Sequence, residues 1–144
     1  MVDATLINEV REMYEKCIVA EKPENALKIF ELIKQFTEIN KVCKEELEDM
    51  DLIIAQFNVV DYDFKYWLKL GEGIFDYGKG LVDEATFSMI ANQETLGGLL
   101  SGEIDGTSAY MSGDLKIEGS LQDAIAYGEF LGMIMELFRR MEEE

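Results

Sequence analysis

A short strand joined directly to a long terminal helix constrains the fold of this chain more than any other feature. Residues 115–118 alternate apolar and charged side chains, which is the period-two pattern of a half-buried strand. Gly119 interrupts the strand, and Ser120 is placed to cap an amphipathic helix predicted for residues 120–141. Each element has one apolar face. The two faces therefore close a core, or they leave a space that another molecule fills.

Two helices are predicted at the start of the chain. Residues 3–20 place apolar side chains three and four positions apart, which is the spacing of an amphipathic helix. Lys22-Pro23 interrupts this stripe, and proline suits the first turn of a second helix that extends to about Leu47. These two helices form a predicted hairpin within residues 1–49, and residues 50–144 form the remainder of the molecule.

After Asp51 the periodicity of the sequence changes from helical to strand-like. In one predicted strand Lys65 and Lys69 mark the wet face, so the alternate side chains point inward. Because the connections are tight and glycine-rich, an antiparallel meander is expected. The four strands of this meander are predicted at residues 52–60, 64–70, 74–77 and 85–90.

Two short helices are predicted before the final strand, capped by Asn92 and Asp105. Gly97-Gly98 lies in the middle of the first, where each glycine costs about 1 kcal/mol relative to alanine. Close backbone packing and mobility are two alternative reasons for these glycines. The whole pattern predicts an α+β fold: a five-stranded, mostly antiparallel sheet covered on one face by helices, with an N-terminal helical hairpin.

The charge balance of the chain excludes several classes of partner. Its 144 residues carry 30 acidic and 13 basic side chains, for a net charge of −17. Nucleic-acid binding requires clustered lysine and arginine, so no nucleic acid is expected as a partner, and anionic membrane surfaces are disfavoured for the same reason. No apolar run approaches the ~20 residues of a membrane-spanning helix, so stable membrane insertion is not expected.

The cysteines and the N-terminus predict a cytoplasmic location. Cys17 and Cys43 are widely spaced on helical patterns, which favours free thiols in a reducing compartment. Asp3 and Glu9 interrupt the N-terminal segment before an apolar signal-peptide core can form.

The sequence lacks the residue combinations that most catalytic sites use. It contains no histidine, which removes the commonest general base, the catalytic triads and most zinc and iron sites. Neither cysteine belongs to a C-x-x-C pair, and the segments at residues 71–73 and 78–80 lack the spacing of phosphate-binding loops. We therefore expect no enzyme activity, no metal and no cofactor.

The predicted strands and helices carry many large apolar side chains, more than a packed core would need. Methionine and aromatic residues adapt to apolar ligands, although an ordinary α+β core uses the same residues. This surplus occurs on the predicted strands and on the helices that follow them, at Phe57, Phe64, Tyr66, Phe87, Met89, Leu96, Leu99, Tyr127, Phe130, Met133 and Met135.

Residues from about 52 to 138 resemble the sterol carrier protein family. The resemblance rests on the leucine pair before Ser-Gly at residues 99–102 and on the Leu-Lys-Ile-Glu-Gly strand at residues 115–119, followed by the last helix. The alternating strand at residues 85–89, ahead of the helix that contains Leu96, is similar as well. These motifs occur in the family's order over some 90 residues, which makes the match more specific than a single short motif.

This resemblance implies a helix-covered sheet that encloses an apolar tunnel for sterols, fatty acyl chains or other lipids, which are carried without chemistry. The chain departs from the family in its acidity and in its longer N-terminal hairpin, which covers the open sheet face, forms a lid over the tunnel or pairs two copies as a homodimer. The predicted lipid-binding residues are Phe57, Phe64, Tyr66, Leu68, Phe87, Met89, Leu96, Leu99, Leu100, Leu115, Ile117, Tyr127, Leu131 and Met135.

Two hypotheses of function follow. The first is non-catalytic binding and carriage, or presentation, of an apolar lipid such as a fatty acyl chain, an isoprenoid or a sterol-like molecule. The alternative is an accessory or scaffold module with a filled core that dimerises through its N-terminal helices. An open tunnel binds a hydrophobic dye saturably and a filled core does not, so dye binding separates the two.

Overall fold

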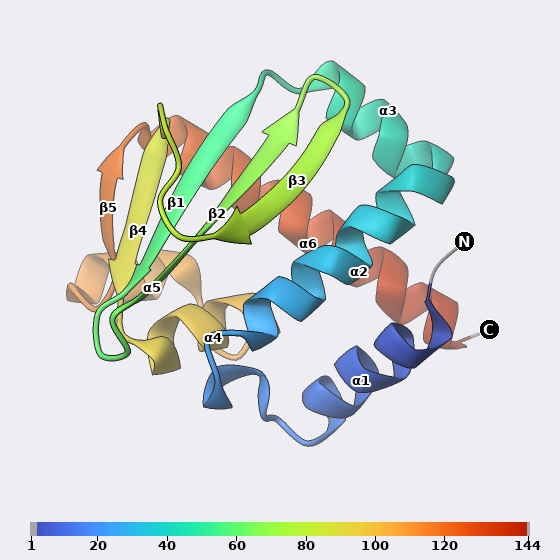
Figure 1. Ribbon diagram of the computed structural model, residues 1–144, viewed down its shortest axis with the longest axis horizontal. Coiled ribbons are helices and arrows are strands. Elements are labelled where there is room, and N and C mark those ends of the chain that lie inside the picture. Colours follow the sequence, from blue (N-terminus) through green and yellow to red (C-terminus); the bar gives the residue numbers. More distant parts are fainter. Residues whose placement is uncertain (1–2, 144) are drawn as a thin grey trace.

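One five-stranded sheet and the helices on one of its faces form the two layers of this protein. The structure, a computed structural model, describes residues 3–143 and is shown in Figure 1. Within these residues the elements, in order, are α1 (Ala4–Glu15), a short 3-10 helix η1 (Val19–Glu21), α2 (Asn25–Ile39), α3 (Lys41–Asp49), β1 (Ile53–Val59), β2 (Phe64–Gly71), β3 (Ile74–Lys79), β4 (Phe87–Ala91), α4 (Gln93–Ser101), α5 (Gly106–Ser112), β5 (Lys116–Gly119) and α6 (Leu121–Glu143). The predicted α+β class and the mostly antiparallel sheet are confirmed.

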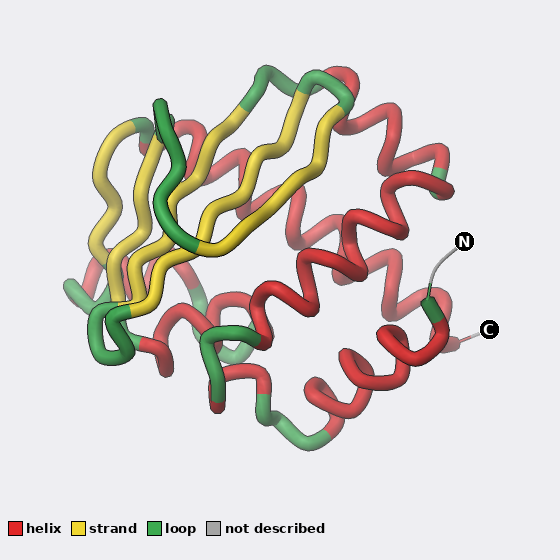
Figure 2. Tube along the Cα trace, in the orientation of Figure 1, coloured by secondary structure: helices red, strands yellow, loops and turns green. Residues whose placement is uncertain are grey.

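The sheet is not the simple meander that the tight turns predict. Strands β1, β2 and β3 do form a meander, but the strand order is β3-β2-β1-β4-β5, and β4 lies parallel to β1 rather than beside β3. Residues 80–86 make this crossover across the face of the sheet away from the helices, where Figure 2 shows them as a loop.

The side chain of Gln56 holds this crossover against the sheet. Its Nε2 donates to the carbonyl oxygens of Tyr66 and Gly80 at 3.0 Å each, and its Oε1 accepts from the backbone N–H of Val82 at 2.8 Å. Gln56 is nearly fully buried although it is polar, and these bonds satisfy its amide group. A buried side chain in β1 thus decides the path of a connection that short-range turn patterns predict differently.

The N-terminal helices differ from the predicted hairpin in two places. α1 ends at Glu15, before a turn in which Cys17 adopts a positive φ of 56°. The predicted second helix divides at Asn40, whose backbone is extended and whose side chain accepts from the N–H of Cys43 at 3.1 Å. Asparagine competes with continuous helix by capping a new one, which is why α2 and α3 are separate. The predicted caps Asn92 and Asp105 are confirmed.

The helices α2 and α6 cover the same face of the sheet. α6 packs on β1, β4 and β5, and α2 packs on β3. The ring of Phe30 on α2 lies 6.1 Å from that of Phe57 on β1 and 5.9 Å from that of Tyr66 on β2. The N-terminal helices therefore lie on the inner face of the sheet and not on its opposite face.

The glycines of α4 are explained by close packing. A Cβ added to Gly97 would lie 2.5 Å from the Cα of Ala20 in η1, and one added to Gly98 would lie 2.4 Å from Cδ1 of Ile104. Of the two alternative reasons for these glycines, the structure shows close backbone approach at Gly97, whereas Gly98 is packed against the side chain of Ile104.

Candidate functional site

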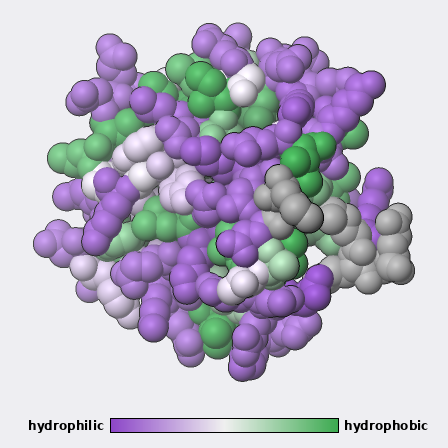
Figure 3. Space-filling view, turned by 45° about the vertical axis from the view of Figure 1, so that its right-hand side comes forward, coloured by the Kyte–Doolittle hydropathy of each residue, from purple (hydrophilic) through white to green (hydrophobic). Residues whose placement is uncertain are grey.

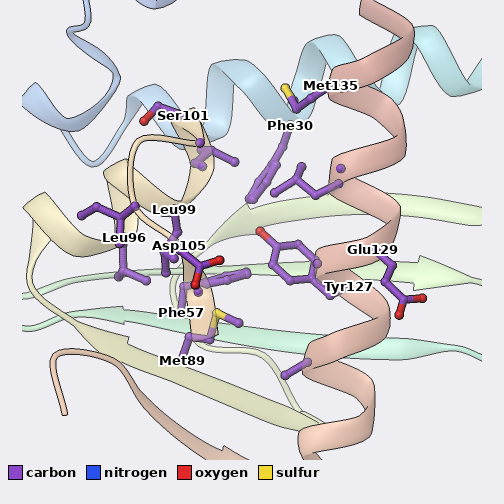
Figure 4. Close-up of a pocket in the computed structure, with 18 of the residues that line it drawn as sticks. Phe30, Phe57, Met89, Leu96, Leu99, Ser101, Asp105, Tyr127, Glu129 and Met135 are labelled. Carbon is purple, nitrogen blue, oxygen red and sulfur yellow. The ribbon is translucent and has the colours of Figure 1, made fainter. Parts of the chain in front are cut away.

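An apolar cavity lies between the sheet and the helices that cover it. Its volume is about 1220 Å³, somewhat more than the roughly 300–1,000 Å³ of pockets for drug-sized molecules. Side chains from α1, α2, α4, α6, three central strands and the edge strand β5 border it, and Figure 4 shows a part of this lining. The sheet forms its floor and the helices form its walls.

The floor is a single row of side chains across four neighbouring strands. Tyr66 on β2 pairs with Phe57 on β1, Phe57 pairs with Met89 on β4, and Met89 pairs with Ile117 on β5. All four border the cavity. The rings of Phe57 and Tyr66 stack at the centre of this row, with centroids 4.8 Å apart.

Most of the predicted lipid-binding residues border this cavity. Leu96, Leu99 and Leu100 lie on α4, Leu115 precedes β5, and three further residues lie on α6. Together with the floor, the predicted residues that the structure brings together are Phe57, Tyr66, Met89, Leu96, Leu99, Leu100, Leu115, Ile117, Tyr127, Leu131 and Met135.

Three predicted residues, Phe64, Leu68 and Phe87, do not border the cavity. Leu68 and Phe87 occupy the next row of the sheet, both paired with Ala55, and are almost completely buried under the helices. Phe64 lies one row to the other side, where the ammonium of Lys79 is 5.1 Å from its ring centroid. All three point to the correct face, because strand alternation fixes the face, but packed side chains cover their rows.

The N-terminal helices supply a wall of the cavity whose individual residues the sequence pattern did not identify. Because they carry ordinary amphipathic stripes, nothing in their periodicity separates a wall of a cavity from a packed core. The aromatic residues Phe30 and Phe36 in the apolar stripe of α2 were the only feature of the sequence that pointed to this wall. The lining residues from α1 and α2 are Ile7, Val10, Arg11, Tyr14, Phe30, Leu32, Phe36 and Ile39.

The apolar arc of α6 is wide because it serves two surfaces. Phe130 and Ile134 are buried, and the ring of Phe130 stacks on that of Phe75 in β3 at 6.1 Å. Another strip of the same helix borders the cavity, including Gly128 and Gly132, where an added Cβ would meet no atom within 4 Å. These two glycines leave open space beside α6.

Four tyrosines border the cavity, and burial raises the pKa of three of them, Tyr14, Tyr66 and Tyr127. The hydroxyl of Tyr14 lies 3.1 Å from the carbonyl oxygen of Leu100 and 3.4 Å from Sδ of Met135, so it ties α1 to α4 and α6. Burial raises the pKa of Tyr14 to about 12. It also raises the pKa of Tyr66 and of Tyr127, and the proximity of Tyr66 and Tyr14 raises that of Tyr127 further. All three hydroxyls therefore stay protonated at neutral pH.

In the part of the chain that the structure describes, the charged side chains that border this cavity lie along its edge. Arg11, Asp105, Glu129 and Arg139 are exposed, and Glu136 forms ion pairs with Arg139 and Arg140. No group of three or more Cys, Asp or Glu side chains that could hold a metal ion is found in residues 3–143. The arrangement is suited to holding an apolar molecule whose body lies against the floor.

A sheet whose one face is covered by helices around an apolar cavity defines a class of proteins that bind ligands inside the fold. The chain belongs to the SCP-2 sterol transfer family, which matches residues 31–132. The predicted resemblance is thereby confirmed, and the match begins within α2. Membership supports the binding or transfer of an apolar lipid. No curated protein matches the chain.

Solved structures share this fold at low sequence identity. The chain is similar to a ubiquinone synthesis protein, UbiJ-SCP2, with 17% identity, a TM-score of 0.59, and coverage of 83% of this chain and 97% of that one. It is similar to the sterol carrier protein domain 2 of Helicoverpa armigera, with 17% identity, a TM-score of 0.58, and coverage of 78% and 91%. Sterol Carrier Protein 2 from Yarrowia lipolytica gives 20% identity, a TM-score of 0.54, and coverage of 69% and 90%.

The same fold also occurs as part of a larger protein. The sec-alkylsulfatase Pisa1 from Pseudomonas sp. matches 73% of this chain over 15% of its own length, with 18% identity and a TM-score of 0.53. At these identities the likeness concerns the fold alone.

Proposed function

We propose that this protein binds an apolar lipid in its cavity and carries or presents it without chemical change. The cavity of about 1220 Å³ between the sheet and the helices is the observation that carries the proposal. Its floor and walls are mostly apolar, and its charged residues lie at the edge. A fatty acyl chain, an isoprenoid or a sterol-like molecule matches this lining, because each offers a long apolar body.

The apolar surface of such a ligand supplies enough free energy for useful affinity. Burying one methylene contributes about 0.8 kcal/mol, so about ten to twelve methylenes contribute roughly 8–10 kcal/mol. Micromolar binding corresponds to a net free energy of about 8 kcal/mol. The burial of the ligand has to supply this and also offset the entropic cost of association. A ligand with more than twelve buried methylenes, as in a long fatty acyl chain, is therefore expected to reach micromolar affinity without a charged anchor.

The proposed contact residues are those predicted residues that border the cavity, together with the wall from α1 and α2. Phe57, Tyr66, Met89 and Ile117 form the floor against which the ligand lies, and Leu99, Leu115, Tyr127 and Met135 lie beside it. We do not retain Phe64, Leu68 and Phe87 as contact residues, because packed side chains separate them from the cavity.

Native mass spectrometry with organic extraction tests this proposal. The purified protein is expected to show a discrete mass excess that extracts as one lipid class, or to take up a lipid when lipids are offered. A mass equal to that of the polypeptide, with no uptake, contradicts the proposal.

A pair of matched variants connects uptake to the cavity. Because Gly128 and Gly132 border open space, the double change to Phe narrows the cavity, whereas the double change to Ala adds two methyl groups only. The Phe variant is expected to lose most lipid uptake and the Ala variant to keep it. Equal uptake by both variants would mean that the lipid binds elsewhere.

The cellular location of the protein and the partners that it lacks are also part of the proposal. We propose a cytoplasmic protein with no nucleic-acid partner, and the exposed free thiol of Cys17 supports a reducing compartment. Within residues 3–143, no helix is both long enough and apolar enough to cross a bilayer.

We further propose that residues 1–49 and 50–144 act as a helical cover and a lipid-binding part, and that two copies pair through the cover. Two of its apolar side chains, Ile39 and Val42, are more than half exposed, which supports pairing. Sedimentation equilibrium measures this directly: a dimer mass is expected at micromolar concentration, and a monomer mass throughout would remove pairing while leaving lipid carriage intact.

A further inference from the structure

Two buried tyrosines that border the cavity have hydroxyl groups without a hydrogen-bond partner among the described residues. Tyr66 on β2 is 4% exposed and Tyr127 on α6 is 7% exposed. Neither hydroxyl forms a hydrogen bond with any residue that the structure describes. Within the same part of the chain, no fully enclosed side-chain nitrogen or oxygen lacks a partner, so both oxygens border the open volume of the cavity.

Of the other tyrosines, Tyr62 and Tyr110 are exposed to solvent, whereas the two that are not exposed, Tyr14 and Tyr77, both have hydrogen-bond partners. Tyr14 meets the carbonyl oxygen of Leu100, and the hydroxyl of Tyr77 donates to the carboxylate of Glu31 at 2.6 Å. A hydroxyl that faces apolar surroundings alone costs free energy, and phenylalanine would fill the same space without that cost. Tyr66 and Tyr127 are therefore unusual in both position and bonding.

The two tyrosines converge on one part of the cavity. Their rings lie on Phe57 at the centre of the floor, with centroid distances of 4.8 Å for Tyr66 and 5.6 Å for Tyr127. Figure 4 shows Tyr127 extending from α6 with its hydroxyl directed toward Phe30 and the side of the cavity formed by α4. One donor thus comes from the floor and one from the wall.

We propose that the ligand carries an uncharged oxygen within its apolar body, as a ketone, quinone, ester or alcohol does, and that this oxygen accepts hydrogen bonds from Tyr66 and Tyr127. The inference rests on the proposed lipid-binding function and specifies the class of ligand.

A neutral oxygen fits these donors better than a carboxylate does. Both hydroxyls are uncharged, and burial raises their pKa values, so they remain donors at neutral pH. A carboxylate beside them would need a cation to offset its desolvation. The arginines of the lining, Arg11 and Arg139, are exposed at the edge, and Arg139 already contacts Glu136.

A matched pair of probes tests this assignment. Tridecane and 7-tridecanone have the same length and differ by one central oxygen, and both are offered as competitors of a cavity-bound fluorescent dye. The double variant Tyr66→Phe/Tyr127→Phe is expected to bind the ketone about tenfold more weakly relative to tridecane than the wild type does, because two neutral hydrogen bonds are lost. Tyr77→Phe is the control, since Tyr77 does not border the cavity, and it is expected to leave the ratio unchanged.

The outcomes separate the two proposals. An unchanged ratio in the double variant, with both probes still bound, overturns the tyrosine anchor and leaves lipid carriage standing. Failure of both probes to displace the dye from the wild type counts against the proposed function itself.

Infrared spectroscopy of the wild type keeps the test independent of whether the variants fold. The carbonyl of bound ¹³C-labelled 7-tridecanone is expected to absorb at lower frequency than the same ketone in hexadecane, as a hydrogen-bonded carbonyl does. An absorption at the hexadecane frequency overturns the anchor.

Discussion

At the residue scale, Tyr14 shows how a single side chain joins the N-terminal helix to the rest of the fold. Its hydroxyl contacts α4 through Leu100 and α6 through Met135, which are far apart in the sequence. Its ring borders the cavity, so the same residue closes the structure and forms part of the wall. Because burial raises the pKa of Tyr14, the free energy of unfolding is expected to change with pH in the alkaline range.

We predict that Tyr14→Phe lowers the free energy of unfolding at neutral pH. We also predict that this free energy falls less with rising alkaline pH in the variant than in the wild type. The folded-state pKa of about 12 lies above the ~10 of an unfolded tyrosine, so the folded state holds the proton more tightly. Its contribution is complete below about pH 10 and is lost as the pH rises through 12. Urea unfolding between pH 8 and 11.5 is expected to show the wild type losing about 2 kcal/mol more than the variant by pH 11.5. Parallel pH profiles would contradict this role.

The two cysteines are predicted to differ in reactivity. Cys17 is exposed and Cys43 is buried, and burial together with the nearby Glu46 raises the pKa of Cys43 to about 11. The neighbouring Glu103 also raises the pKa of Cys17, so the difference rests on exposure: a thiol reagent at pH 8 is expected to modify Cys17 in the folded protein and Cys43 only after unfolding. Mass spectrometry of the time course measures both, and equal rates for the two would show that Cys43 is accessible.

At the element scale, the glycines of α4 and α6 have opposite roles. Gly97 allows the backbone of α4 to approach η1, whereas Gly128 faces open space beside α6. Both lie within helices, where alanine is intrinsically better by about 1 kcal/mol. The surroundings therefore decide the sign of a glycine-to-alanine change.

We predict that Gly97→Ala destabilises the protein and that Gly128→Ala stabilises it. The new methyl group at Gly97 would lie 2.5 Å from the Cα of Ala20, and such overpacking costs about 1–3 kcal/mol. At Gly128 no atom lies within 4 Å, so a gain of about 1 kcal/mol is expected. Urea denaturation at neutral pH measures both free energies of unfolding. A stabilised Gly97→Ala variant would show that α4 can move away from η1.

At the scale of the whole molecule, the large negative net charge affects how the protein meets membranes rather than how the cavity binds a ligand. The net charge is −17, and in the view of Figure 3 hydrophilic residues cover most of the surface around smaller hydrophobic patches. Long-range repulsion lowers the rate at which such a protein meets an anionic surface, and salt screens it.

Lipid transfer is therefore predicted to depend on the charge of the acceptor membrane. Transfer of a bound fluorescent fatty alcohol is expected to be faster to vesicles of phosphatidylcholine than to vesicles that contain phosphatidylserine. Raising the salt concentration is expected to reduce this difference, as measured by stopped-flow fluorescence. Faster transfer to the anionic vesicles at low salt would show that a local basic contact outweighs the net charge.

The sequence by itself determined most of the helices and strands, the inward faces of the strands and the family. These follow from interactions between neighbours in the chain: the alternation in β2, the caps at Asn92 and Asp105, and the motif order between residues 99 and 119. Such patterns fix which side of a strand is apolar, and they placed Tyr66 and Phe64 correctly on the same face.

Only the tertiary structure decided which apolar residues border the cavity. The crossover held by Gln56 sets β4 beside β1 and so brings Met89 into one row with Phe57 and Tyr66. The residues of that row border the cavity, whereas Leu68 and Phe87 in the next row are buried and do not border it. Contacts between segments distant in the sequence set these positions, so no local periodicity encodes them, and the N-terminal wall could be recognised only once α1 and α2 were seen against the sheet.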